Sequence, residues 1–116
     1  MITNNGLNRI ANSYSSVPAY LLVGSGAVEV LGTDTALVGE FERLSLDSFD
    51  VTDNTVKFYG SRSSVVANDD VITNFGLGIA AGVGSSDLQV ANLISSLVHS
   101  TDFDIGVEFW FTFNRA

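Results

Sequence analysis

Residues 103–113 read FDIGVEFWFTF, and this stretch decides the fold class. Its odd positions all carry large apolar side chains: Phe103, Ile105, Val107, Phe109, Phe111 and Phe113. Its even positions are mostly polar or small, with Trp110 as the exception. Six consecutive matches to a two-residue period predict a β-strand with one buried and one solvated face.

The predicted strand is long for so short a chain. Twelve residues in a strand reach about 40 Å at roughly 3.3 Å per residue. A compact domain of this length has a radius of gyration of about 13 Å and is about 35 Å across. The strand must therefore cross the whole domain, curve around its core or extend onto a neighbour, which suits a β-sandwich that assembles.

Length and composition indicate one soluble domain spanning residues 1–116. Hydrophobic residues make up 46% of the 116 residues and charged residues only 16%, which argues against disorder. Thirteen acidic and five basic residues give a net charge of −8, and such a surface disfavours nucleic-acid partners. The absence of cysteine excludes disulfides and thiol chemistry. Neither a secretory signal nor a membrane span is predicted.

The N-terminus is predicted to form one helix. Leu7, Ile10, Ala11 and Tyr14 recur at helical spacing, and Thr3 or Asn4 would cap the start. The remainder favours strands at residues 19–23, 27–31, 39–52, 55–59 and 71–79. In residues 39–52 the apolar positions change from even to odd near Asp47, which suggests a β-bulge. Residues 87–98 fit a helix or a strand.

The predicted fold is therefore mainly β: an antiparallel, jelly-roll-like β-sandwich with one N-terminal α-helix. A turn at residues 53–54 gives a hairpin that buries alternate residues. The helix face bearing Leu7 and Ile10 is expected to pack on the core. Apart from that face, the predicted core is Phe103, Ile105, Val107, Phe109, Phe111, Leu44, Leu46, Val56 and Phe58.

No catalytic, cofactor-binding or metal site is predicted. Residues 76–82 (GLGIAAG) have the wrong spacing for a dinucleotide-binding loop and are expected to be glycines at bends in strands. Residues 24–26 (GSG) lack the nucleophile-elbow pattern, and His99, the sole histidine, is expected at a surface or a strand end. The acidic pairs at residues 69–70 and at Asp102 and Asp104 lack a calcium-loop series, so solvated carboxylates are expected. An enzyme is the outlying alternative.

Trp110 is the strongest candidate for a contact residue. It falls on the polar face of the terminal strand, where an uncovered indole is costly. It is expected to be covered by the helix or buried in an interface, and both options remain open. Close backbone approach at Gly76, Gly78 and Gly82 is a second possibility for the interface.

Four segments, in this order, resemble a known group. Residues 2–10 (ITNNGLNRI), 22–26 (LVGSG), 33–43 (TDTALVGEFER) and 71–77 (VITNFGL) are similar to segments of small tailed-phage structural proteins related to tail-collar fibre domains. The chain departs from that pattern at residues 78–80 (GIA), where the group has an aromatic residue and a charged turn. The resemblance implies a virion β-sandwich without enzymatic activity, and it favours a strand at residues 87–98.

These observations lead to one expected function and two alternatives. Fibre proteins with such a domain usually continue into a shaft, whereas this sequence ends at Ala116. We therefore expect a capsid cement (decoration) protein that forms a homotrimer, is made in the host cytoplasm and binds the major capsid protein on the virion. A short tail, collar-fibre or adaptor subunit that binds tail proteins is the close alternative. A cellular binding module is the non-viral alternative. No cofactor, nucleic acid or membrane is expected.

Overall fold

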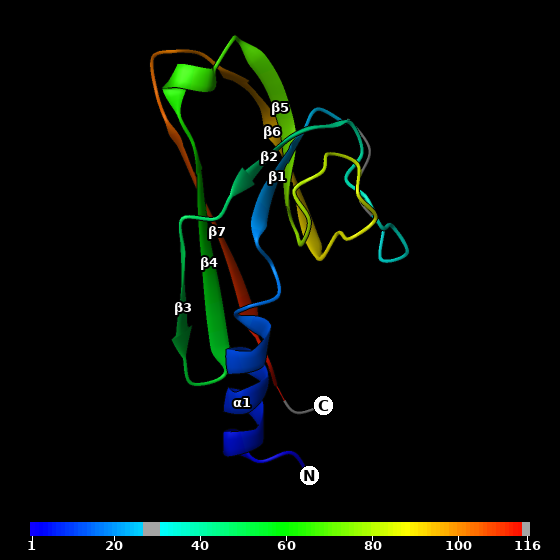
Figure 1. Ribbon diagram of the computed structural model, residues 1–116, viewed down its shortest axis with the longest axis vertical. Helices are drawn as coiled ribbons and strands as arrows, with labels where there is room; N and C mark the ends of the chain where they lie inside the picture. The colour runs from blue at the N-terminus through cyan, green and yellow to red at the C-terminus, as the bar shows by residue number, and fades with distance from the viewer. Residues whose placement is uncertain (27–30, 115–116) are drawn as a thin grey trace.

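The protein is an antiparallel β-sandwich with an N-terminal helix, as predicted (Figure 1). The computed structural model describes residues 1–26 and 31–114, so residues 27–30 of the predicted strand 27–31 lie outside it. One sheet has the order β2-β1-β5-β6 and the other the order β3-β4-β7. The elements are α1 (Asn4–Tyr14), β1 (Tyr20–Gly24), β2 (Glu40–Ser45), β3 (Ser48–Thr52), β4 (Thr55–Arg62), the 3-10 helix η1 (Ser64–Val66), β5 (Asp70–Gly78), β6 (Val90–His99) and β7 (Ile105–Thr112).

The terminal strand β7 has the predicted alternation but is shorter than predicted. Phe109 is 7% exposed, and its odd-numbered neighbours in the strand are half-buried against the same core. The prediction fails for Phe103, which is 37% exposed and precedes the strand. The Asp104 carboxylate accepts a hydrogen bond from the Ser64 backbone N–H (2.6 Å) and fixes the chain there, so pairing with β4 begins only at Ile105.

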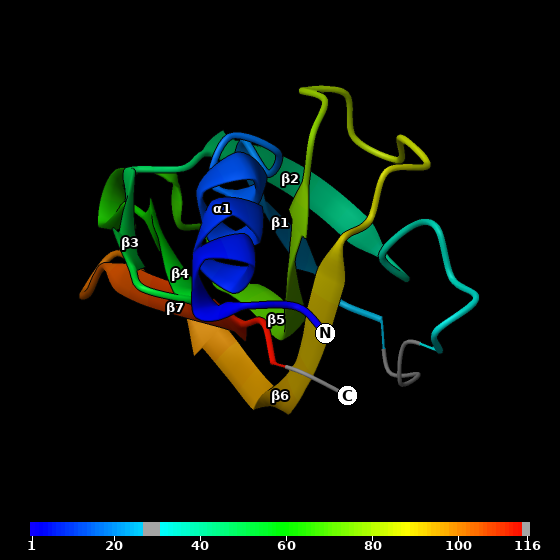
Figure 2. The same cartoon turned by 90° about the horizontal axis from the view of Figure 1, so that it is seen from below.

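Helix α1 closes one end of the space between the sheets (Figure 2). The Thr3 side chain caps it by accepting from the Gly6 N–H (3.2 Å), as predicted. Leu7 and Ala11 are buried, and the Tyr14 ring packs edge-on against aromatic rings of β4 and β7. Ile10 was expected in the core but is 40% exposed, because it lies to one side of the face centred on Leu7 and Ala11.

The predicted β-bulge near Asp47 is wrong, because the chain changes sheets there. The Leu46 N–H donates to Ala19 O (3.1 Å), which extends the pairing with β1. The next N–H, that of Asp47, donates to Tyr59 O (2.8 Å) and begins the pairing with β4. The even-numbered Leu44 and Leu46 face the core from the four-stranded sheet, and the odd-numbered Val51 faces it from the three-stranded sheet. This explains the change in the apolar pattern. Leu44 and Leu46 are half-buried against the core.

The hairpin of β3 and β4 is confirmed. Thr52 pairs with Thr55, and Asp53 has φ = 52°, the left-handed conformation that tight two-residue turns require. Val56 and Phe58 are completely buried, as expected from the alternation. They anchor one sheet to the common core, which also includes Leu21, Val23, Ile72, Phe75, Leu77 and Phe109.

Residues 87–98, ambiguous between helix and strand, are a strand from Val90 onward; this strand, β6, ends at His99 and forms one edge of the four-stranded sheet. The register between β5 and β6 shifts, since Ile72 pairs with Leu97 but Asn74 pairs with Leu93. Residues 94–96 of β6 therefore lie opposite Thr73 alone and form a bulge.

We expect Phe109→Ala to lower the free energy of unfolding by about 3–5 kcal/mol, because it leaves a cavity between the sheets. Phe103→Ala is the matched control, and its effect should be much smaller because Phe103 is partly exposed and precedes the strand. Chemical denaturation of both variants measures the difference. Equal losses would show that the two aromatic side chains contribute equally to the core.

Candidate contact surface

The outer face of the three-stranded sheet presents Trp110 and its neighbours to solvent. Because Phe109 points into the core, Trp110 and Glu108 point outward from β7. Lys57 lies opposite Trp110 on β4, and Asp50 lies opposite Lys57 on β3. In the next row Tyr59 lies opposite Glu108. We call these five residues, Asp50, Lys57, Tyr59, Glu108 and Trp110, the Trp110 face.

Trp110 is 62% exposed and is not covered by the helix, so the first of its two predicted environments is excluded. Its ring is nevertheless held in place. The Lys57 Nζ lies 4.1 Å from the ring centroid, and the indole Nε1–H donates to the Glu108 carboxylate (3.2 Å). Trp110 is therefore a large exposed aromatic group with a restricted orientation.

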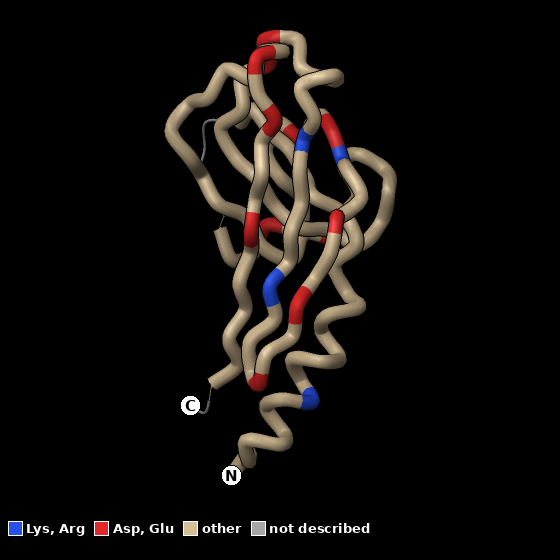
Figure 3. Tube along the Cα trace, turned by 90° about the vertical axis from the view of Figure 1, so that its left-hand side faces the viewer, with Lys and Arg blue, Asp and Glu red and all other residues tan. Residues whose placement is uncertain are grey.

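The charges around Trp110 are mainly negative. The middle strand β4 carries two basic residues, Lys57 and the buried Arg62, and Figure 3 shows acidic positions along the strands on both sides of it. A shallow groove of about 620 Å³ adjoins these residues, between Tyr59–Ser61 and Gly106–Glu108, with Asp47 at its rim. The lack of a side chain at Gly106, where an added Cβ would meet no atom within 4 Å, leaves the groove open. This surface can accept a protruding side chain, and its charge favours a basic one.

The three glycines predicted at the interface are placed differently from Trp110. Gly76 and Gly78 are buried within β5. A Cβ on Gly76 would lie 2.7 Å from the Val90 carbonyl oxygen, and one on Gly78 would lie 2.9 Å from Leu22 Cδ1. Their close contacts are thus with this chain's own sheet, which leaves no room for a partner. Gly82 is exposed in the loop after β5.

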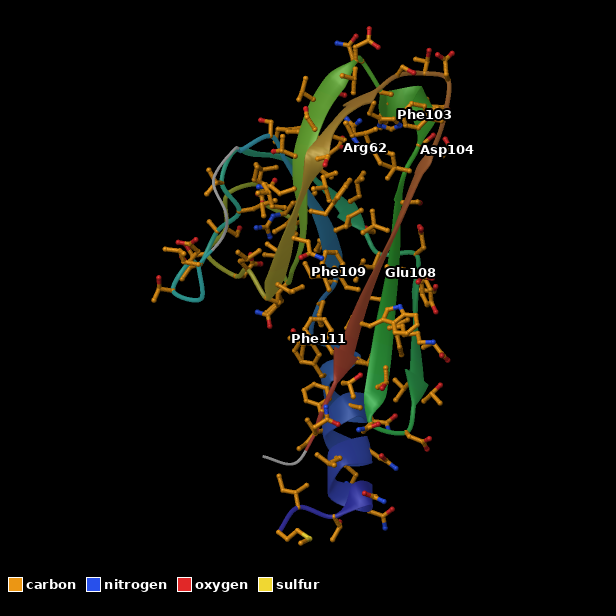
Figure 4. All side chains as sticks on the ribbon, turned by 180° about the vertical axis from the view of Figure 1, so that it is seen from behind. Arg62, Phe103, Asp104, Glu108, Phe109 and Phe111 are labelled. Atoms are coloured by element: carbon orange, nitrogen blue, oxygen red, sulfur yellow. The ribbon has the colours of Figure 1, made fainter. Side chains whose placement is uncertain are left out.

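His99 is at the strand end predicted for it, but it is completely buried, so the expectation of a surface position is wrong. Arg62 Nη1 donates to His99 Nδ1 (2.6 Å), and His99 Nε2 donates to Phe103 O (2.8 Å). An arginine can only donate, so Nδ1 must be the acceptor. Figure 4 shows Arg62 at the same end of the molecule as Phe103 and Asp104.

Arg62 forms the centre of an ionic cluster that the sequence did not reveal. Its Nε donates to Glu42 (2.6 Å) and its Nη2 donates to Asp70 (2.9 Å). The hydrogen bond from Arg62 is the main cause of a pKa for the Asp70 carboxyl below its ordinary value. Its partners Asp70, Glu42 and His99 lie 8, 20 and 37 residues away in the sequence, so no local motif marks the cluster.

A second buried arginine fixes the loop between β5 and β6. Arg43 pairs with Glu40 (3.1 Å) and Asp87 (2.9 Å) and also donates to the Ala80 and Ser85 carbonyl oxygens. Backbone N–H groups of residues 79 and 80 donate to Asp87, which completes the network. The glycine-rich loop is therefore held by an ionic cluster of its own chain.

The remaining candidates from the sequence have structural contacts. Asp70 accepts a hydrogen bond from Arg62, and Asp104 accepts one from the Ser64 N–H. Asp69 adopts a left-handed turn conformation (φ = 54°). Within residues 1–26 and 31–114, no group of three or more His, Asp and Glu side chains is arranged to hold a metal ion. The Ser25 N–H donates to Gly39 O (3.1 Å), so Ser25 belongs to a different set of contacts from His99.

Comparison of the chain with protein-family models, with curated proteins and with solved structures found no match. The resemblance to tail-collar fibre proteins therefore remains a prediction. No helix in the described part of the chain has the length and apolar character of a membrane span.

We expect Arg62→Met to lower the free energy of unfolding at pH 7 by about 3 kcal/mol, the lower end for a broken buried ion pair, since both carboxylates keep some contact with water. The loss should shrink with acidification. The folded-state pKa of Asp70 is depressed, so its contribution is complete above its unfolded value of about 3.9 and disappears as pH falls through the folded value. Denaturation curves between pH 7 and pH 2 test this.

Arg9→Met is the control for the loss of one positive charge, because Arg9 is an exposed residue of α1. Its effect on stability should be small throughout this pH range. A loss for Arg62→Met that stays constant down to pH 2 would contradict the assigned role of the Asp70 carboxylate.

Proposed function

We propose that this protein is a non-enzymatic structural protein of a tailed-phage virion that binds the outer surface of the capsid as a cement protein. The Trp110 face is its contact surface. The resemblance of four ordered segments to phage structural proteins supports the class of protein. The exposed, orientated indole of Trp110 supports the mode of action, and it is the observation that carries the proposal.

Trp110 has the properties of an interface anchor. Protein interfaces obtain much of their binding energy from a few tryptophan, tyrosine and arginine side chains near the centre of the contact. Trp110 and Tyr59 lie on the same face, in adjacent rows of the sheet. Lys57 and Glu108 already restrict the indole, so less side-chain entropy is lost when a partner covers it.

The charge of the face defines the partner that it fits. Asp50 and Glu108 flank Lys57, and Asp47 lies at the rim of the adjoining groove. A basic patch on an assembled capsid lattice complements this surface. The chain's net charge of −8 also suits a position outside the shell, away from packaged DNA.

Binding of this kind stabilises a shell by mass action. A subunit that binds only assembled capsid proteins shifts their equilibrium toward the assembled state. Several weak contacts made by linked copies add through effective concentration, so self-association is part of the proposal. The trimer expected from the sequence is one form of it.

We expect Trp110→Ala to weaken attachment to capsids by about 30-fold, the effect of losing an anchor worth about 2 kcal/mol. Phe49→Ala is the control. Phe49 is 56% exposed and pairs with the buried Phe58, so it lies on the other face of the same sheet from Trp110. Both variants should keep their fold, and binding to particles stripped of the protein measures the difference. Equal affinities for the two variants would exclude the Trp110 face as the contact surface.

Placement on the head is tested by stripping the protein from virions and heating the particles. Heads that lose thermal stability while tails remain intact would support a cement protein, and added protein should restore the stability. Unaffected heads with lost tails or fibres would transfer the assignment to the tail, collar-fibre or adaptor alternative.

A further inference from the structure

Strand β6 leaves one long edge of the four-stranded sheet without a partner. It spans Val90–His99 and, within residues 1–26 and 31–114, pairs only with β5, so no described strand lies beside its outer backbone groups. Figure 2 shows β6 along the rim of the molecule, with β5 on its inner side. An unpaired edge presents N–H and C=O groups that another strand can bind.

The charge pattern distinguishes β6 from the other three edge strands. Edge strand β2 carries Glu40 and Glu42, β3 carries Asp50, and β7 carries Glu108. Strand β6 reads VANLISSLVH and contains no acidic or basic residue other than the buried His99. In a chain of net charge −8, contact between two copies is least costly where no carboxylates meet.

The outer face beside this edge is apolar. Leu93 and Val98 are 48% and 52% exposed. Val98 lies opposite Val71, which is also exposed, so the two valines form an apolar pair on the surface of the sheet. A strand added beside β6 would cover part of these side chains, and this burial favours association.

We propose that β6 pairs in antiparallel fashion with β6 of a second copy, which joins the two four-stranded sheets into one continuous sheet. The occupant is a second copy because identical strands in antiparallel pairing are self-complementary around a two-fold axis. The bulge at residues 94–96 lies at the centre of β6. The residues before the bulge in one copy then pair with those after the bulge in the other. Because this gives two short hydrogen-bonded ladders in place of one long ladder, we expect a dimer that dissociates on dilution.

This inference rests on the self-association included in the proposed function and names its surface. A Ser95→Lys substitution tests it, because it places two ammonium groups near the two-fold axis. Ser48→Lys is the matched control, since it makes the same change at an exposed serine of edge strand β3. Light scattering over a concentration series measures the dissociation constant, and circular dichroism confirms that each variant is folded.

We expect a wild-type dimer, a dissociation constant at least 10-fold higher for Ser95→Lys, and an unchanged value for Ser48→Lys. Hydrogen exchange of the wild-type protein provides a second measurement, in which amides of β6 should gain protection as the concentration rises. A monomer at all concentrations, a trimer, or a dimer equally stable in both variants would overturn the pairing. A monomer that still binds stripped capsids through Trp110 would overturn this pairing and the proposed self-association, and it would leave the capsid-binding role of the Trp110 face intact.

Discussion

The guanidinium of Arg62 holds the two sheets together at one end of the sandwich. It extends from β4 in one sheet and binds Glu42, Asp70 and His99, which lie on β2, β5 and β6 of the other. A buried guanidinium is costly to remove from water, and only a full set of acceptors offsets that cost. The cluster therefore fixes the relative position of the sheets as well as stabilising them. At the opposite end, the Tyr14 ring and the buried face of the helix contact the core through aromatic and apolar groups.

The two buried arginines also determine the character of the surface. Arg43 and Arg62 are each paired with two carboxylates inside the fold, so neither positive charge is available to the exterior. Among the described residues, Arg9 and Lys57 are the remaining basic side chains, and Lys57 lies against Trp110. The protein thus presents a strongly acidic exterior in which Trp110 and the uncharged β6 edge stand out. We propose a different partner for each feature: a basic surface for Trp110 and a second copy of the chain for β6.

The sequence could predict those parts of the fold that depend on local periodicity. The alternation in β7, the hairpin at Asp53 and the cap at Thr3 all follow from neighbouring residues. The change of sheet near Asp47 was not predictable, because a bulge and a sheet change shift the apolar pattern in the same way. The burial of His99 depends on Arg62, 37 residues earlier. For the contact surface, alternation placed Trp110 on the outward face, but its exposure depended on where the helix packs. Gly76 and Gly78 were assigned to the interface because glycine permits close backbone approach, and only the three-dimensional structure shows that their close neighbours are β6 and β1 of this chain.

The change of sheet between β2 and β3 has a consequence for how the protein folds. Among the strands that the structure describes, β1 and β2 enter the first sheet, β3 and β4 the second, β5 and β6 the first again, and β7 the second. Neither sheet is complete until most of the chain is available. Strand β1 pairs with the much later β5, and β4 pairs with the terminal strand β7. Pairing at such long sequence separation is slow, since the loop must close before contacts compensate for its entropy. Folding should thus be a single cooperative, millisecond-to-second event that begins after synthesis of most of the chain.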